Sequence, residues 1–302
     1  GLFICGFSVA FMDVALNGQA VAIEEHTKGR WMSSFHGLWS VGAFFAALLG
    51  GLVANFVSPM VNLVVISTLS FLAYFWVNYN LLPPHLDGHL GDEGEELESK
   101  VPLKGKEAMI LWGLGFGLMC ALIPEGGAYD WSGILLQDHM DIGKGLNAAA
   151  APIFSLAMIA SRLLGDRFFE KWGHVKTVQY GGFFGGGIWG LSLITGIPLA
   201  DSHQMASLVI VCIGFGAAGF GMGPFFPAFN LAAASIPGVA PSVGLARIGI
   251  IAIGSYFAGP TIIGGIAEVT SLPIAFAFPV LLMFGAAYQS RFITVKRLSH
   301  EN

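Results

Sequence analysis

The sequence predicts an all-α integral membrane protein built from two related helical bundles. Apolar residues make up 55% of the 302 residues and charged residues only 11%, whereas about a quarter of a soluble domain is charged. Apolar stretches long enough to cross a bilayer, which takes about 20 residues, recur along the chain. The first of these stretches also repeat features of the last. The 42 glycines and 14 prolines suit helices that pack closely and bend inside lipid.

Length and hydropathy predict nine membrane spans. They cover residues 1–23, 32–54, 60–80, 108–133, 147–166, 175–197, 205–228, 242–266 and 273–293. The fourth is longer than one crossing requires and contains Pro124-Glu125-Gly126-Gly127, so we expect the helix to be broken there. Gly259-Pro260 predicts a bend in the eighth span, which serves either gating or packing.

The lysines and arginines predict the orientation, because cytoplasmic loops are enriched in them. When alternate loops are assigned to two sides, one side receives only Lys144, and Arg247 lies inside the eighth span. The other side receives Lys28, Arg30, Lys100, Lys104, Lys106, Arg162, Arg167, Lys171, Lys176, Arg291, Lys296 and Arg297. We therefore expect a multi-pass membrane protein with the 81–107 loop and the C-terminus in the cytoplasm.

An internal repeat divides the chain into two halves. At an offset of 213–214 residues, Gly6-Phe7 matches Gly219-Phe220, Asn17 matches Asn230, Gly50-Gly51 matches Gly264-Gly265, and Pro59 matches Pro273. The acidic 81–107 segment has the composition of a solvated linker. We expect 1–80 to be helices four to six of an N-terminal bundle, 108–302 to be a complete six-helix bundle, and about three helices to be missing ahead of Gly1.

Two sets of motifs resemble known families. The first resembles the signature loop of major facilitator proteins: Ser161-Arg162-Leu163-Leu164-Gly165-Asp166-Arg167, Trp172-Gly173 and Lys176. The resemblance implies the major facilitator fold and a conformational latch at Arg162, Gly165, Asp166 and Arg167. The second set is similar to the fucose-permease-like branch: Gly6-Phe7, Asp13-Val14-Ala15-Leu16-Asn17, the run from Ser33 to Gly42, and the run from Pro124 to Trp131. That similarity implies that Asp13 takes part in proton-coupled sugar symport and that the protein lies in the inner membrane of a bacterium.

Ionisable residues inside predicted spans are the candidate site, because burying them in lipid is costly. Asp13 lies mid-span with Asn17 one turn away, which suits a proton-coupling site or, alternatively, a structural pair with a base. Glu125 and Asp130 flank the expected break, where they can accept hydrogen bonds from the hydroxyls of a sugar while Tyr129 and Trp131 stack on its ring. Glu125 is also, with Asp13, a predicted proton-coupling residue; the alternative is that the two acids lie in a hydrated outer mouth.

Four further residues belong to the same prediction. His36, with Trp39 beside it, can relay protons or bind substrate, or can simply be a helix-end histidine. Arg247 can neutralise a buried acid or bind an anion, or can snorkel to the lipid head groups. Asn230 is the repeat counterpart of Asn17 and completes the predicted substrate-binding set.

The sequence predicts a secondary active transporter of a small polar solute, a sugar or a related metabolite, moved together with protons. We expect a monomer without a cofactor, a metal or a nucleic-acid partner, and not an enzyme: the sequence has no phosphate-binding loop, no His-Glu-x-x-His and no Gly-x-Ser-x-Gly. The alternatives are an efflux transporter of amphipathic compounds and, from another class, a membrane sensor or an intramembrane enzyme dependent on His36.

Overall fold

The computed structural model describes residues 2–53, 56–83, 86, 105–143, 146–236 and 239–294, and all regular elements in these ranges are helical. The longer helices are α1 (Leu2–Thr27), α2 (Met32–Val53), α3 (Pro59–Tyr79), α4 (Lys106–Met140), α5 (Ala150–Tyr180), α6 (Gly186–Leu199), α7 (Gln204–Met222), α8 (Phe225–Ala234), α9 (Pro241–Val269) and α11 (Ala277–Gln289). The short elements are η1 (Leu146–Ala148), the π-helix η2 (Gly181–Gly185), α10 (Leu272–Ala275) and η3 (Ser290–Phe292). Most of the predicted 81–107 linker, with Lys100 and Lys104, lies outside the described residues, as do Lys144, Lys296 and Arg297.

Six helical segments within the described residues are long and apolar enough to cross a membrane. They are Met60–Tyr79, Ala108–Met140, Leu146–Leu199, Gln204–Ala234, Pro241–Val269 and Leu272–Phe292. The segment Leu146–Leu199 has 54 residues and contains two predicted spans, 147–166 and 175–197. Helices α1 and α2 occupy the first two predicted spans but are not among the six. The protein is therefore an all-helical, multi-pass membrane protein.

The predicted break in the fourth span is wrong. Helix α4 runs as one helix of 35 residues with Pro124 inside it. Proline removes only one helical hydrogen bond, and packed neighbours in a bundle can tolerate that loss. Gly127 serves a close contact instead, because a Cβ there would come within 2.9 Å of Ile263 Cδ1 on α9.

The interruption lies in the seventh predicted span. Helix α7 ends at Met222 and α8 begins at Phe225; Gly223 and Pro224 between them keep right-handed helical dihedral angles, so the break is one of helical hydrogen bonding. Pro224 and Pro227 both lack a backbone N–H, which frees the carbonyls of Phe220 and Gly223 from helical hydrogen bonding. An unpaired carbonyl inside an apolar bundle needs another donor.

A tight turn at Gly173 lies between the predicted fifth and sixth spans. Gly173 has φ +77° and ψ 163°, a backbone conformation that only glycine adopts without strain. After the turn the chain continues through η2, where Gly181 allows α7 to approach and Gly182 allows α11 to approach. A Cβ at Gly181 would lie 2.1 Å from Gly221 O, and a Cβ at Gly182 would lie 2.6 Å from Met283 O. Glycine is required at 173 by conformation and at 181 and 182 by space.

We expect Gly173→Ala to lower the stability of the protein by about 1–3 kcal/mol through backbone strain alone, because no other atom lies within 4 Å of the added Cβ. The matched control is Gly187→Ala in α6, which also meets nothing within 4 Å but has an ordinary helical conformation. That variant should be neutral or stabilised by roughly 0.5–1 kcal/mol. Thermal unfolding in detergent measures both, and equal midpoints would contradict the role of Gly173.

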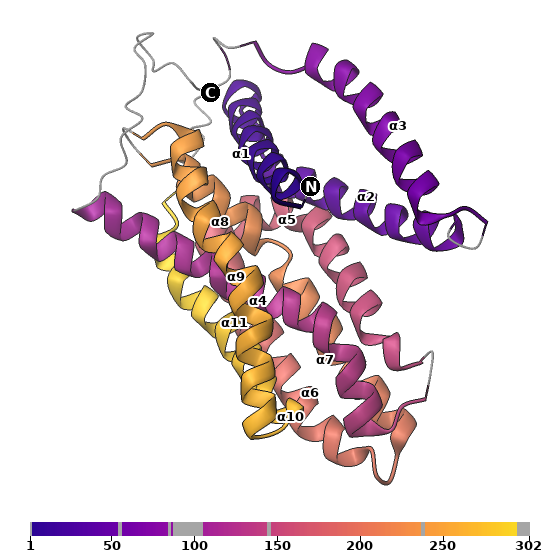
Figure 1. The fold of residues 1–302 in the computed structure, drawn as a ribbon. Coiled ribbons are helices and arrows are strands. Elements are labelled where there is room, and N and C mark those ends of the chain that lie inside the picture. Colours follow the sequence, from indigo (N-terminus) through magenta and orange to yellow (C-terminus); the bar gives the residue numbers. More distant parts are fainter. Residues whose placement is uncertain are drawn as a thin grey trace.

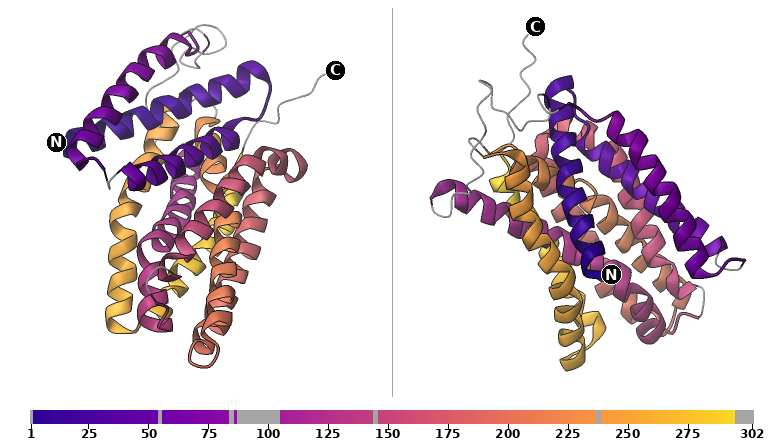
Figure 2. Two further views of the ribbon diagram at one scale, coloured as in Figure 1. Left: turned by 90° about the vertical axis from the view of Figure 1, so that its right-hand side faces the viewer. Right: turned by 45° about the horizontal axis from the view of Figure 1, so that its top comes forward.

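Helices α4 to α11 form one bundle, and α1 to α3 lie across one end of it (Figures 1 and 2). The bundle has an extensive apolar core at whose centre Trp189, Phe215 and Phe276 pack edge to face, with ring centroids 5.2–5.9 Å apart. A second apolar cluster joins the two parts and comprises Ala20, Val21, Met32, Leu231, Ala234 and Leu245. Helix α3 stands apart, and none of its apolar window is buried (Figure 1).

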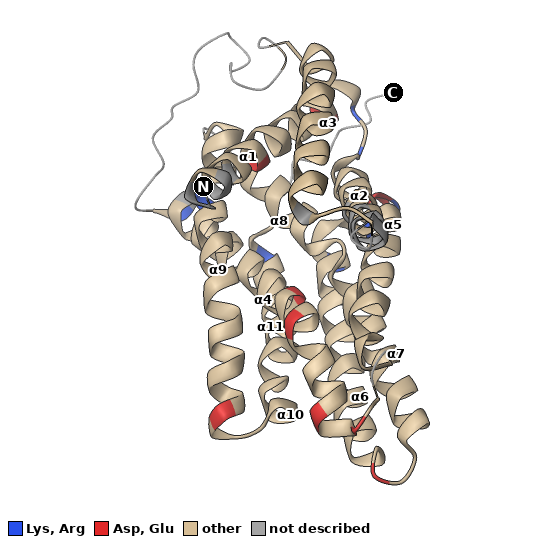
Figure 3. Ribbon diagram, turned by 45° about the vertical axis from the view of Figure 1, so that its right-hand side comes forward, with Lys and Arg blue, Asp and Glu red and all other residues tan. Residues whose placement is uncertain are grey.

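Charged residues are distributed unequally along the bundle. Lysine and arginine gather at the end where α1 and α2 lie, whereas the charged residues that the structure describes at the far ends of α4, α6 and α9 are acidic (Figure 3). Those acidic residues are Asp138, Asp141, Asp201 and Glu268. The end that carries α1 and α2 is hereafter called the basic end.

Candidate functional site

The structure has two parts, α1–α3 and α4–α11, which are hereafter called the two halves. They meet most closely where α2 crosses α5. Gly165 on α5 faces Ser33 on α2, and a Cβ at Gly165 would come within 2.0 Å of Ser33 Oγ. Gly37 on α2 also lies close to α5, with Leu163 Cδ2 2.8 Å from the position of a Cβ. The Ser33 hydroxyl donates to the carbonyl of Arg162 at 2.7 Å. The two glycines therefore bring the two backbones into direct contact, as small residues do between membrane helices.

Two carboxylates cap the start of α2. Glu24, at the end of α1, accepts hydrogen bonds from the backbone N–H groups of Trp31 at 2.6 Å and Met32 at 2.8 Å. Asp166, on α5, accepts from the N–H groups of Ser33 at 3.1 Å and Ser34 at 2.9 Å, and from the Ser34 hydroxyl. The first N–H groups of a helix have no helical partner, and the helix dipole favours negative charge there. The contact of Asp166 with Ser33 and Ser34 joins the two halves and is called the inter-bundle cap.

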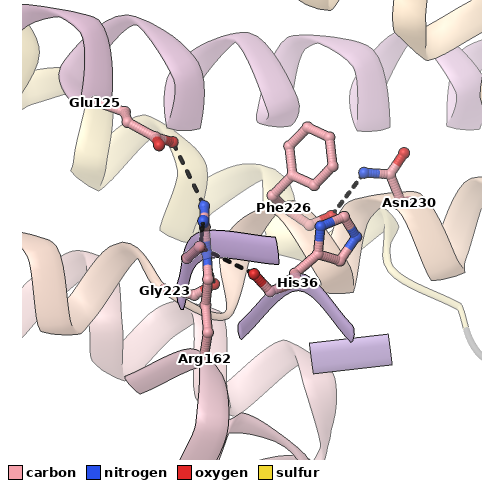
Figure 4. Close-up of polar contacts among 7 residues, drawn as sticks. His36, Glu125, Arg162, Gly223, Phe226 and Asn230 are labelled. Carbon is pink, nitrogen blue, oxygen red and sulfur yellow. Dashed lines mark hydrogen bonds and ion pairs between the residues drawn. The ribbon is translucent and has the colours of Figure 1, made fainter. Parts of the chain in front are cut away.

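A buried ion pair lies beyond this contact, further into the bundle. Arg162 on α5 is only 4% exposed, and its Nη2 lies 3.6 Å from Glu125 Oε2 on α4 (Figure 4). Its Nη1 donates to Ser40 Oγ on α2 at 2.5 Å. A buried charge needs a partner and hydrogen bonds to compensate for lost hydration. Arg162 therefore links α2, α4 and α5 through one side chain.

The break between α7 and α8 supplies the third partner of Arg162. Its Nε donates to the carbonyl of Gly223 at 3.4 Å (Figure 4). This is the carbonyl that Pro227 leaves without a helical donor, since the residue four positions on has no N–H. Pro227 thus leaves the Gly223 carbonyl free to accept a hydrogen bond, and the buried Arg162 guanidinium supplies the donor.

A second group of polar side chains lies on α1 and α2. His36 Nε2 lies 3.1 Å from Asn17 Oδ1, and Asn17 donates to the Asp13 carbonyl at 2.8 Å and to Asp13 Oδ1 at 3.2 Å. Ser40 donates to the carbonyl of His36 at 2.9 Å and so connects this group to Arg162. Asn17 is buried, whereas Asp13 lies at the exposed rim. The connected side chains are called the central polar cluster: Asp13, Asn17, His36, Ser40, Glu125 and Arg162.

The repeat pair Asn17 and Asn230 has the same local geometry in both halves. Asn230 on α8 is buried and donates to the Phe226 carbonyl at 3.0 Å, four residues earlier, as Asn17 does to Asp13. The His36 ring packs edge-on against the Phe226 ring, with centroids 4.8 Å apart (Figure 4). His36 therefore contacts both α1 and α8.

The remaining predicted site residues lie outside these contacts. Trp39 is 67% exposed, and Asp130, Arg167 and Arg247 are also exposed. Tyr129 packs edge-on against Phe154 at 5.6 Å, one turn along α4 from Glu125.

Trp131 turns away toward α9. Its ring lies 3.2 Å from where a Cβ on Gly264 would stand, and its buried indole N–H has no hydrogen-bond partner within the described residues. Tyr129 and Trp131 therefore face different helices, so the structure does not bring them together around one ligand.

Sequence reasoning assigned Arg162 to the latch alone and did not find its partnership with Glu125. It gave Ser40 no role, although this serine lies on the helical face of His36, and it missed the carbonyl of Gly223, for which the spacing of Pro224 and Pro227 was a signal. Tyr256 on α9, which lies within electrostatic reach of Asp13, Glu125 and Arg162, carried no sequence signal.

Comparisons with known proteins agree with this architecture. The chain is 29% identical over 296 residues to an uncharacterized MFS-type transporter of Yersinia pestis, covering 97% of this chain and 71% of that protein. It is 31% identical over 283 residues to the uncharacterized transporter y4wD of Sinorhizobium fredii (91% and 68%), and 26% identical over 283 residues to the membrane protein MosC of Rhizobium meliloti (91% and 64%). No solved structure matches the chain. The sequence model of the Major Facilitator Superfamily matches residues 1–243, and the chain therefore belongs to this family of membrane transporters.

Proposed function

We propose that the protein is a secondary active transporter that moves a small polar solute, a sugar or a related metabolite, together with protons. The observation that carries this proposal is the Arg162–Glu125 ion pair, which lies inside the bundle and is connected by hydrogen bonds to α2 and to the break before α8. Charged groups inside a membrane bundle are costly and mark transport pathways by default. The similarity of the Asp13 and Glu125 segments to the fucose-permease-like branch supports a sugar as the solute.

Glu125 and Asp13 are the proposed proton carriers. Protonation of Glu125 removes its attraction for Arg162 and leaves a guanidinium and a carboxyl that can each hydrogen-bond a solute hydroxyl. Asp13 lies at the other end of the central polar cluster, reached through Ser40, His36 and Asn17. The cluster offers donors and acceptors from both halves, which suits a hydroxyl-rich solute bound between them.

The proposed topology has nine crossings with the basic end in the cytoplasm. The clustering of lysine and arginine at that end supports it (Figure 3). The contacts between the two halves described above lie toward the same end, including the second apolar cluster and the inter-bundle cap. We therefore propose that the structure is a state closed toward the cytoplasm, from which rocking of the halves would open the central polar cluster to the cytoplasm.

External pH in a lightly buffered suspension of expressing cells tests the function. Sugars and polyols are added one at a time, with Asp13→Asn and Glu125→Gln as the loss-of-coupling variants. We expect one compound to alkalinise the medium through the unmodified protein, and neither variant to do so, because each lacks a carboxyl that carries the proton.

Trp39→Phe is the matched control, because Trp39 is exposed and lies outside the central polar cluster; it should keep the pH signal. Full alkalinisation by a variant carrying both Asp13→Asn and Glu125→Gln would overturn the proposed coupling. Silence across the whole panel in the unmodified protein would overturn the sugar class and favour efflux.

A further inference from the structure

A groove at the basic end of the bundle, separate from the central polar cluster, is lined by α4, α9 and the end of α11. It has a volume of about 540 Å³. Its walls are mostly apolar and include Met109, Trp112 and Phe116 on α4 and Ile251 on α9. Trp112 is 69% exposed and Met109 57% exposed, so both remain open to the surroundings of the bundle. Gly113 lets the Phe292 ring pack directly against α4 in the lining of the groove, because a Cβ at Gly113 would come within 2.3 Å of that ring.

Cations stand at the mouth of this groove. Arg291 is part of the lining, and Lys106 begins α4 one turn before Met109. The Arg291 guanidinium is held over the rings of Tyr288 at 3.8 Å and Phe292 at 4.9 Å, and its Nη1 donates to the Tyr288 hydroxyl at 2.5 Å. Among the described residues, those that line the groove include no acid. The arginine is thus positioned by aromatic contacts and keeps donors for an anionic ligand.

One buried polar atom in the lining has no partner. Gln289 Oε1 is inaccessible to solvent and accepts no hydrogen bond from the described part of the chain. Buried acceptors are nearly always paired in native structures. Rotation of the Gln289 side chain, which lines the groove, would bring this oxygen to a ligand with a hydroxyl donor near its charged group.

We propose that this groove binds an anionic glycerophospholipid from the leaflet that surrounds the basic end. An acyl chain lies along Met109, Trp112 and Phe116, the phosphate pairs with Arg291 and Lys106, and a head-group hydroxyl donates to Gln289. Basic pockets between membrane helices bind anionic head groups, and each cation near the surface favours them. The aromatic residues at the mouth suit the level of the membrane interface.

Quenching of Trp112 fluorescence by lipids with brominated acyl chains tests the proposal in the intact protein. Nanodiscs contain either brominated phosphatidylglycerol among plain phosphatidylcholine or brominated phosphatidylcholine among plain phosphatidylglycerol. The contribution of Trp112 is the difference between the unmodified protein and Trp112→Phe. We expect brominated phosphatidylglycerol to reach half-maximal quenching at a mole fraction at least about fivefold lower than brominated phosphatidylcholine does. This ratio corresponds to about 1 kcal/mol of attraction from one nearby cation.

Three controls make the result specific. Lys106→Gln with Arg291→Gln should abolish the preference, whereas Lys176→Gln, a lysine away from the groove, should keep it. Trp76 on α3 is 73% exposed and lines no part of the groove, so its contribution, measured with Trp76→Phe, should show no preference between the lipids and also reports correct insertion. Equal quenching of Trp112 by both lipids, or a preference that survives the double substitution, would overturn the proposal. Absence of any Trp112 quenching would overturn it as well, because protein rather than lipid would then cover the groove.

Discussion

Replacing Arg162 with methionine should abolish solute accumulation and destabilise the protein more than any other single substitution in the central polar cluster. The substitution leaves Glu125 without its cation and removes the donors to Ser40 and Gly223. Breaking a buried pair by removing one partner costs about 3–5 kcal/mol. The Glu125 side chain is 19% exposed, so we expect the low end, about 3 kcal/mol, and a loss of transport of roughly 100-fold or more. Thermal unfolding and solute uptake measure the two effects.

A pair of further variants separates charge from packing at this site. Glu125→Gln combined with Arg162→Met should be more stable than Arg162→Met alone, because no unpaired carboxylate then remains in the bundle. Arg247→Met is the matched control, since Arg247 is an exposed arginine on a neighbouring helix, and it should unfold near the temperature of the unmodified protein. An Arg162→Met protein that unfolds and transports normally would show that the ion pair carries neither stability nor function.

Replacing Asp166 with alanine should release the two halves from each other at the basic end. The change removes the acceptor for two backbone N–H groups and one hydroxyl of α2. Loss of a helix cap costs about 1–2 kcal/mol, and about 1.4 kcal/mol changes a population tenfold. A cysteine at Ala234, a buried position of the second apolar cluster, should therefore react with maleimide about tenfold faster in the Asp166→Ala background.

The experiment uses detergent-solubilised protein in which Cys5, Cys120 and Cys212 have been replaced by serine or alanine. Arg167→Ala is the control, because Arg167 is the exposed neighbour of Asp166 and lies outside the inter-bundle cap. It should leave the labelling rate unchanged. Equal rates for Asp166→Ala and the unmodified protein would mean that the cap does not hold the halves together.

The sequence predicted the helical class well, because apolar length is a local property. It placed the interruption of helical hydrogen bonding in the wrong span. Pro124 with two glycines after it looked like a break, yet α4 continues through it because its neighbours pack closely against Gly127. The break beside Gly223 depends on two prolines three residues apart together with an external donor, Arg162. The donor comes from another helix, so no local pattern could identify it.

Individual residues of the central polar cluster were predictable from the sequence, but the contacts between them were not. Glu125 and Asp13 were found because acids in apolar stretches are conspicuous. Their partners were not, since Arg162 lies in a motif that suggested a loop at the membrane surface. Asp166 was assigned to a latch, but the sequence did not identify its partners. In the structure these are two backbone N–H groups and one hydroxyl of α2. Contacts between helices far apart in the chain follow from packing geometry, which single residues do not encode.

The start of α2 has one cap from its own half and one from the other half. Glu24 lies in the same half as Trp31 and Met32, so its cap would persist in the proposed rocking motion, whereas Asp166 would leave Ser33 and Ser34. The helix therefore keeps a defined first turn throughout a cycle, and only the detachable carboxylate changes partners, from peptide groups to water. Loss of this cap is then one of the terms in the free-energy difference between the proposed end states, so substitution at position 166 should shift the balance between them without loss of the fold.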